Sequence, residues 1–117
     1  MTLRPRSDLY LVWLHGEIKT PPFSRRARLE AGELLRRLQR RQQLTMPHSR
    51  TMSSIAPRCH ELRVQDEQVT WRIVYRIDPD AIVIAAVFRK STQRTPQSVI
   101  DACRRRLRTF DRIKGEL

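Results

Sequence analysis

Apolar and polar residues follow two different spacings along this 117-residue chain, and the β-type spacing predicts four strands. Residues 9–14 form a short apolar run rich in β-forming side chains, which is typical of a first buried strand. Residues 59–65 and 69–77 alternate around a turn at 66–68, so they predict a hairpin. Residues 81–88 are apolar on both faces, which indicates the central strand of a sheet.

Helical spacing appears twice. Residues 25–43 have an apolar stripe, with Ser24 as a plausible N-cap and Thr20 before Pro21 as a competing start. Pro96 opens a second amphipathic helix that extends to about residue 112. Between the first helix and the hairpin, residues 44–58 contain two prolines and no period, so we expect an irregular connector. A connector of this length is often functional.

These elements predict one α+β domain spanning residues 1–117. We expect a small, mostly antiparallel sheet of three to four strands with an N-terminal and a C-terminal amphipathic helix. Cys59 and Cys103 lie far apart and have no histidines at ligand spacing, so we expect free thiols and no zinc site. No apolar run reaches the ~18 residues of a membrane span, and residues 9–14 are too short for a signal peptide, so a cytoplasmic location is expected.

The charge balance changes this picture, because 24 Lys and Arg against 12 Asp and Glu give a net charge of +12. Such a surplus predicts a polyanionic partner, nucleic acid first, although Arg-rich composition alone is an open alternative. The surplus is uneven. Residues 24–58 and 89–117 each contain nine basic residues, whereas 59–88 contain three basic and five acidic ones. The predicted helices and their flanks therefore carry nearly all of the positive charge.

The few basic residues of the strands are placed by period. In 69–77, Arg72 and Arg76 lie on the face opposite the core face of Trp71 and Tyr75, and a hairpin with 59–65 adds Arg63 to their face. Neighbouring like charges repel, so this cluster indicates a bound anion. The alternative is neutralisation by an acidic neighbour: Glu61, Asp66 or Glu67.

The histidines give weaker signals. His60 alternates with Leu62 and Val64, so we interpret it as a core or edge residue rather than a catalytic one. His48 lies in the connector and is a secondary candidate for reaching a site.

The segments ELR, WRIVYRI and AVFRKSTQRTP, followed by the closing basic helix, resemble the RelE/ParE/HigB superfamily of bacterial type II toxins, in its phage-derived, HigB-like branch. With VWLHGEIKTPPFS the resemblance covers roughly residues 9–113. It implies a RelE-like fold and a ribosome-dependent mRNA endonuclease that needs no metal or cofactor. The implied partners are the ribosome, its mRNA and a cognate antitoxin, usually a helix-turn-helix protein.

The resemblance also implies roles for individual residues. Arg63 and Arg72 match positions that hold the scissile phosphate, and Lys90 matches a basic position after the third strand of the motif, so these three are the catalytic candidates. The family's second basic residue there corresponds to Ser91 in this chain. Other arginines of the strands, flanks and helices are expected to contact RNA: Arg36, Arg40, Arg76, Arg89, Arg94 and Arg105.

The chemistry suits these residue types, because RNA carries its own 2′-OH nucleophile and arginine stabilises developing phosphate charge without changing protonation state. Lys90 is a candidate base or charge stabiliser, and Glu61 is a second candidate base. Two other functions remain open. One is ParE-like inhibition of DNA gyrase on the same fold, and the other is a non-enzymatic nucleic-acid-binding phage accessory protein.

Overall fold

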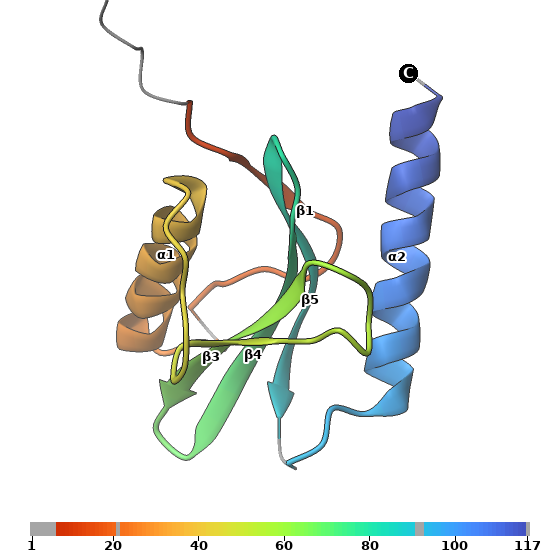
Figure 1. Cartoon of the computed structure of the whole chain (residues 1–117). Helices are drawn as coiled ribbons and strands as arrows, with labels where there is room; N and C mark the ends of the chain where they lie inside the picture. Colours follow the sequence, from red (N-terminus) through yellow and green to blue (C-terminus); the bar gives the residue numbers. More distant parts are fainter. Residues whose placement is uncertain (1–6, 21, 91–92, 117) are drawn as a thin grey trace, which may run out of the picture.

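The computed structural model describes residues 7–20, 22–90 and 93–116, and in this part of the chain one sheet lies between two helices (Figure 1). The predicted α+β class is confirmed. The strands and helices have these bounds: β1 Tyr10–Trp13, α1 Arg25–Gln39, β2 Ser49–Thr51, β3 Cys59–Asp66, β4 Val69–Ile77, β5 Ala81–Lys90 and α2 Gln97–Gly115.

The sheet has the strand order β1-β5-β4-β3-β2. Neighbouring strands pair antiparallel, except that β1 runs parallel to β5. The predicted hairpin is β3 and β4, and its register places Arg63 opposite Arg72. β4 and β5 share a bulge at Val74 and Tyr75. β5 is buried over most of its length, as its apolar sequence predicts, but it lies between β1 and β4. The central strand is β4, so the prediction that residues 81–88 form the central strand is wrong by one position.

α1 covers one face of the sheet. Ser24 is its N-cap, as predicted, and the Ser24 hydroxyl accepts a hydrogen bond of 3.1 Å from the amide of Ala27. The helix ends at Gln39, four residues earlier than predicted. The predicted stripe is buried in full against strand residues such as Leu62, Ile73 and Tyr75: Ala27, Ala31, Leu34, Leu35 and Leu38.

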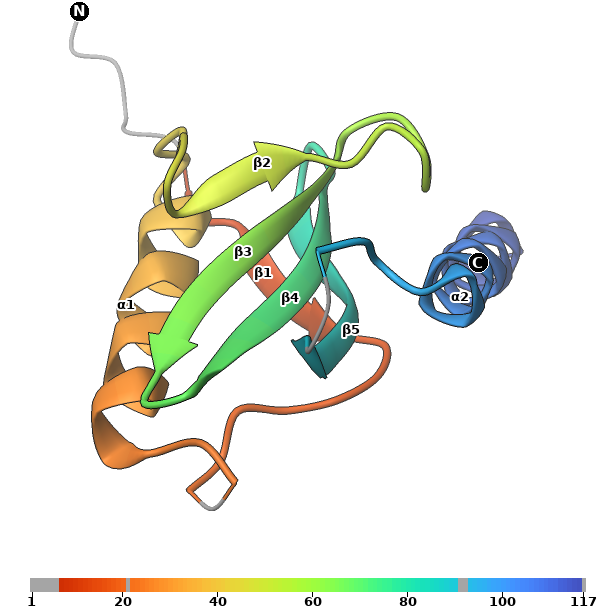
Figure 2. The ribbon, with the colours of Figure 1, turned by 90° about the horizontal axis from the view of Figure 1, so that it is seen from below.

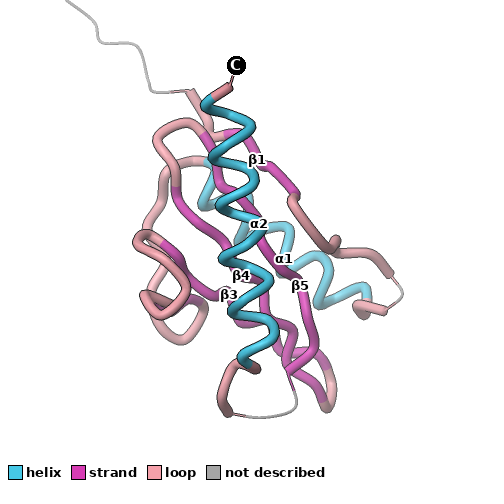
Figure 3. Tube along the Cα trace, turned by 90° about the vertical axis from the view of Figure 1, so that its right-hand side faces the viewer, coloured by secondary structure: helices cyan, strands magenta, loops and turns pink. Residues whose placement is uncertain are grey.

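α2 lies on the opposite face of the sheet (Figure 2). Cys103 and Leu107 are its fully buried residues, and they pack with Cys59, Val74 and Val83. Viewed from the α2 side, the helix runs along the sheet and leaves part of this sheet face uncovered (Figure 3). None of the helices in the described ranges is long and apolar enough to cross a membrane.

The sheet has five strands, one more than the predicted upper limit, and the additional strand is β2. It lies within the predicted irregular connector and pairs with β3 along the outer edge of the sheet. Three residues are too few to show an alternating pattern, so β2 could not be predicted from the sequence. Its position matters because it brings Arg50 opposite Glu61.

Candidate functional site

The three catalytic candidates lie on one face of the sheet, the face that carries α2. Arg63 and Arg72 are direct partners across β3 and β4. On the other side of β4, Phe88 is opposite Arg72, so Lys90, two residues farther along β5, has its side chain on the same face. The hairpin register and the end of β5 thus bring together three cations from three strands.

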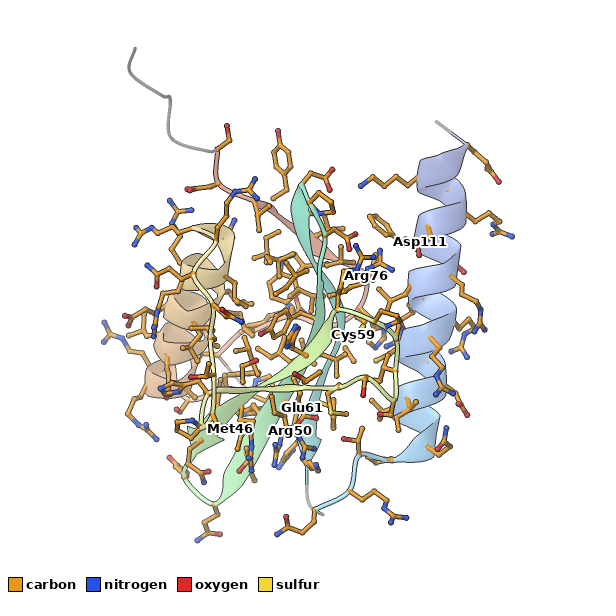
Figure 4. The ribbon with its side chains drawn as sticks, in the orientation of Figure 1. Met46, Arg50, Cys59, Glu61, Arg76 and Asp111 are labelled. Atoms are coloured by element: carbon orange, nitrogen blue, oxygen red, sulfur yellow. The ribbon has the colours of Figure 1, made fainter. Side chains whose placement is uncertain are left out.

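Glu61 lies at the centre of these cations and has no exposed surface. Its Oε1 accepts a hydrogen bond of 2.8 Å from Nη1 of Arg72, and its Oε2 accepts one of 3.3 Å from the hydroxyl of Thr95. Nε of Arg50 lies 3.4 Å from the same Oε1. Figure 4 shows Arg50 and Glu61 side by side at the lower end of the sheet. We call Arg50, Glu61, Arg63, Arg72 and Lys90 the cationic cluster.

The cationic cluster has more positive than negative charge, since one carboxylate faces three guanidinium groups and one ammonium group. Lys90 and Arg72 are 7% and 6% exposed. Nζ of Lys90 and Nε of Arg72 are buried and have no hydrogen-bond partner within the part of the chain that the structure describes. Buried donors without partners are costly. An anion bound at this face would pair with them and offset the surplus charge.

The same environment changes the proton affinity of Lys90. Burial lowers the pKa of its ammonium group, and the positive charges of Arg72, Arg50 and Arg63 act in the same direction, whereas Glu61 opposes them. Burial also lowers the pKa of Arg72, but a guanidinium group stays protonated in proteins. The cluster therefore contains permanent charges beside one group that releases its proton more readily than an ordinary lysine.

Arg76 shares the sheet face of Arg72. It was predicted to contact RNA, but its side chain is buried and paired with carboxylates. It is 5% exposed, and its guanidinium donates to both carboxylate oxygens of Asp78, at 2.7 and 2.8 Å. It donates to Asp111 of α2 as well, at 2.9 and 2.7 Å. Figure 4 shows Arg76 beside Asp111, well above Glu61. These contacts fasten α2 to β4, so we leave Arg76 out of the candidate site.

The other predicted RNA-binding arginines near β5 lie at the edge of the cationic cluster or beyond it. Arg89 is opposite Trp71 in the β4–β5 register, so it faces the α1 side of the sheet, with its guanidinium 5.6 Å from the Trp71 ring centroid. Arg94 is exposed in the segment that leads to Thr95. Ser91 lies outside the described residues.

The predicted helical arginines are exposed but do not form one surface. Arg36 and Arg40 belong to α1 and its C-cap, and Arg36 pairs with Asp8 at 2.7 Å. Arg105 belongs to α2, on the opposite side of the sheet. Among the described helices, α2 shares the face of the cationic cluster and α1 does not, so the helical arginines form two separate basic surfaces.

His60 and His48, the histidines considered above, have different positions relative to the cationic cluster. His60 stacks on Tyr75 with ring centroids 5.3 Å apart, on the sheet face of Leu62 and Val64 where alternation predicts it. His48 is exposed, and its carbonyl oxygen accepts a backbone hydrogen bond of 2.9 Å from Arg63. His48 and Arg63 also line the same cavity of about 310 Å³, so His48 is adjacent to the cluster.

The sequence missed Arg50 and Thr95 as site residues. Arg50 lies in a segment without period, and its role depends on β2 pairing with Glu61. Thr95 precedes Pro96 and reaches Glu61 only after the chain turns back from β5. Within the described residues no group of three or more His, Cys, Asp or Glu side chains is arranged to hold a metal ion.

The fold and site define a small α+β protein with a partly buried cationic cluster on one face of its sheet. A family model, Phage derived protein Gp49-like (DUF891), matches residues 21–108, which include the whole cationic cluster. The chain therefore belongs to this phage-derived Gp49-like family. Comparisons with curated proteins and with solved structures gave no match.

Proposed function

We propose that this protein is the toxin of a type II toxin–antitoxin pair, in the HigB-like branch of the RelE/ParE/HigB superfamily, and that it cleaves mRNA on the ribosome. The observation that carries the proposal is the pairing of Arg63 with Arg72 beside Lys90, with Glu61 as the one carboxylate among them. Membership of the Gp49-like family and the resemblance of the ELR and WRIVYRI segments support it.

The proposed reaction uses the 2′-OH of the RNA as its nucleophile. The 2′-oxygen forms a bond to phosphorus while the bond from phosphorus to the 5′-oxygen breaks, which yields a 2′,3′-cyclic phosphate and a 5′-OH. Arg63 and Arg72 would donate hydrogen bonds to the non-bridging oxygens as negative charge builds on them. These preorganised donors act in a partly dry site, where they are worth more than in water.

Proton transfer falls to Lys90 in this proposal. The 2′-OH must lose a proton and the 5′-oxygen must gain one, and a lysine whose pKa is lowered by burial can exchange protons closer to neutral pH. Glu61 is a poor base, because it is fully buried and both of its carboxylate oxygens are engaged. We assign Glu61 the role of a positioning residue that orients Arg72.

The proposed partners follow from this role. They are the ribosome and its mRNA as target, and a cognate helix-turn-helix antitoxin as inhibitor, all in the cytoplasm. The exposed arginines on the cluster face, such as Arg94 and Arg105, are proposed contacts with RNA phosphates.

Adding the purified protein to ribosomes translating a defined mRNA, then mapping breaks by primer extension, tests the proposal. We expect breaks that require the ribosome and that diminish with Arg72→Lys, which keeps the charge but loses the planar donor geometry. A parallel assay measures DNA supercoiling by gyrase. Inhibition of supercoiling without mRNA breaks would assign the ParE-like activity, and RNA binding without either effect would assign a non-enzymatic role.

A further inference from the structure

A second cavity lies at the other end of the sheet from the cationic cluster, and the proposed function does not use it. It has a volume of about 460 Å³ and is lined by Leu38, Leu44, Ile77 and Ile82, with His60 and Tyr75 beside them. Ile77 is the last residue of β4, and Ile82 is the second residue of β5. Lys90 of the cationic cluster is the last residue of β5, so the cavity and the cluster lie at opposite ends of this strand. We call this cavity the Tyr75 pocket.

The Tyr75 pocket is also on the opposite face of the sheet from the cluster. Its lining residues Leu38, Tyr75 and Ile82 belong to the core between α1 and the sheet, whereas Arg72 and Lys90 face the α2 side. A ligand in the pocket would thus leave the cationic cluster uncovered.

The rim of the Tyr75 pocket is positively charged. The Arg41 guanidinium donates to the carbonyl oxygens of Ser7, at 3.1 Å, and Pro79, at 3.4 Å, and within the described ranges it pairs with no carboxylate. Arg58 lies 3.8 Å from Asp78, but Asp78 is already held at shorter distances by Arg76. Arg41 and Arg58 are exposed, so their charges are available to a ligand.

The apolar floor and the basic rim of the Tyr75 pocket together indicate which kind of ligand it could bind. The aliphatic lining favours an apolar side chain, since removing such a side chain from water is the main source of affinity in cavities of this kind. The guanidinium groups at the rim favour carboxylates next to that side chain. A nucleotide fits less well, because most of the surface inside the pocket is apolar and the Tyr75 ring is almost wholly covered.

We propose that the Tyr75 pocket binds an acidic segment of a partner protein, whose apolar anchor side chain enters the cavity while its carboxylates pair with Arg41 and Arg58. The net charge of +12 attracts any acidic peptide, so the anchor and the pocket residues must be tested separately from charge. The inference does not depend on RNA cleavage.

The probe is a short fluorescein-labelled peptide with one central tryptophan flanked by glutamates, followed by fluorescence anisotropy. The matched peptides replace the tryptophan with alanine, or the glutamates with lysines. The protein variants are Arg41→Gln/Arg58→Gln for the rim and Ile77→Gln for the apolar wall. Arg25→Gln/Arg108→Gln removes the same charge from exposed positions outside the pocket. Circular dichroism and thermal unfolding confirm that each variant is folded.

We expect the glutamate–tryptophan peptide to bind at least about fivefold tighter than the alanine peptide. Binding should weaken at least about fivefold in the rim variant and in Ile77→Gln, and less than about twofold in Arg25→Gln/Arg108→Gln. Absence of binding, equal affinity for the alanine peptide, or an equal loss in the control variant would overturn the proposal. A short RNA whose binding falls in the same two pocket variants would assign the pocket to nucleic acid and also overturn it.

Discussion

Nη1 of Arg72 and Oε1 of Glu61 are 2.8 Å apart at a point where the carboxylate has no exposed surface. A fully buried carboxylate is costly unless it is paired, and Glu61 is paired with Arg72 and faces Arg50 at 3.4 Å. The contact fixes the Arg72 guanidinium in one orientation and leaves its Nε without a partner in the described chain. In the proposed function, Glu61 thereby orients Arg72 toward the RNA phosphate.

Glu61→Gln tests this positioning role. The variant removes negative charge from the cationic cluster, so we expect the KM for ribosome-bound mRNA to stay constant or fall, while kcat falls roughly 10-fold because Arg72 is held less firmly. Thermal unfolding should show a loss of about 3 kcal/mol, since the buried Arg72 and Lys90 lose the counter-charge of Glu61. Glu61→Asp should recover part of kcat, and the exposed Glu67→Gln serves as control. A loss that appears only in KM would contradict the positioning role.

Lys90 makes the free energy of unfolding depend on pH in the alkaline range. Its pKa is lowered from the ordinary 10.5, so between the native value and 10.5 the unfolded chain binds more protons than the folded one. The free energy of unfolding therefore rises with pH across this window. Urea unfolding at several pH values should show wild type gaining stability relative to Lys90→Met as pH rises. Lys19→Met, at an exposed position, controls for the loss of one charge, and a gap independent of pH would contradict the prediction.

Asp111 makes the free energy of unfolding rise with pH as well, but in the acidic range. Its hydrogen bonds with Arg76 hold the pKa of its carboxyl below the ordinary 3.8, so they contribute stability above that value. The contribution disappears as pH falls through the lower, native pKa. We expect Asp111→Asn to be less stable than wild type at neutral pH and equal to it in strong acid, measured by thermal unfolding. Asp101→Asn, which removes a carboxylate from the exposed surface of α2, is the control, and an equal deficit at every pH would argue against the Arg76 contact.

Much of the site follows from sequence alternation. Antiparallel pairing across the turn at 66–68 depends on local residues, so the shared face of Arg63 and Arg72 was predictable. The place of Arg50 was not, because a three-residue edge strand exists only through its pairing with β3. The convergence of Lys90 with these residues likewise requires the β4–β5 register.

Arg76 shows why periodicity alone can misassign a residue. Alternation correctly puts it on the face of Arg72, but Asp111 lies 35 residues later in the chain and meets it only once α2 packs on the sheet. The helical arginines show the same limit. Their charge is plain in the sequence, whereas the placement of α1 and α2 on opposite faces depends on the strand order.

The cysteines should be chemically quiet in the folded protein. Burial raises the pKa of Cys59 and of Cys103 to about 11, and neither has an exposed surface. The thiolate fraction then falls roughly 100-fold below that of an ordinary thiol. A thiol reagent such as DTNB should react slowly with native protein at mildly alkaline pH and fast after guanidinium unfolding. Rapid reaction of both thiols in the native state would contradict the buried placement.

The central claim is that the cationic cluster cleaves RNA through the 2′-OH of the substrate. The most direct measurement is the single-turnover cleavage rate on programmed ribosomes, with the mapped cleavage site carrying either a 2′-OH or a 2′-deoxy sugar. Wild type should cut only the 2′-OH substrate, and Arg72→Lys should cut it roughly 10²-fold more slowly while its affinity for the ribosome changes little. Equal cutting of the 2′-deoxy substrate, or an Arg72→Lys rate equal to wild type, would contradict the claim.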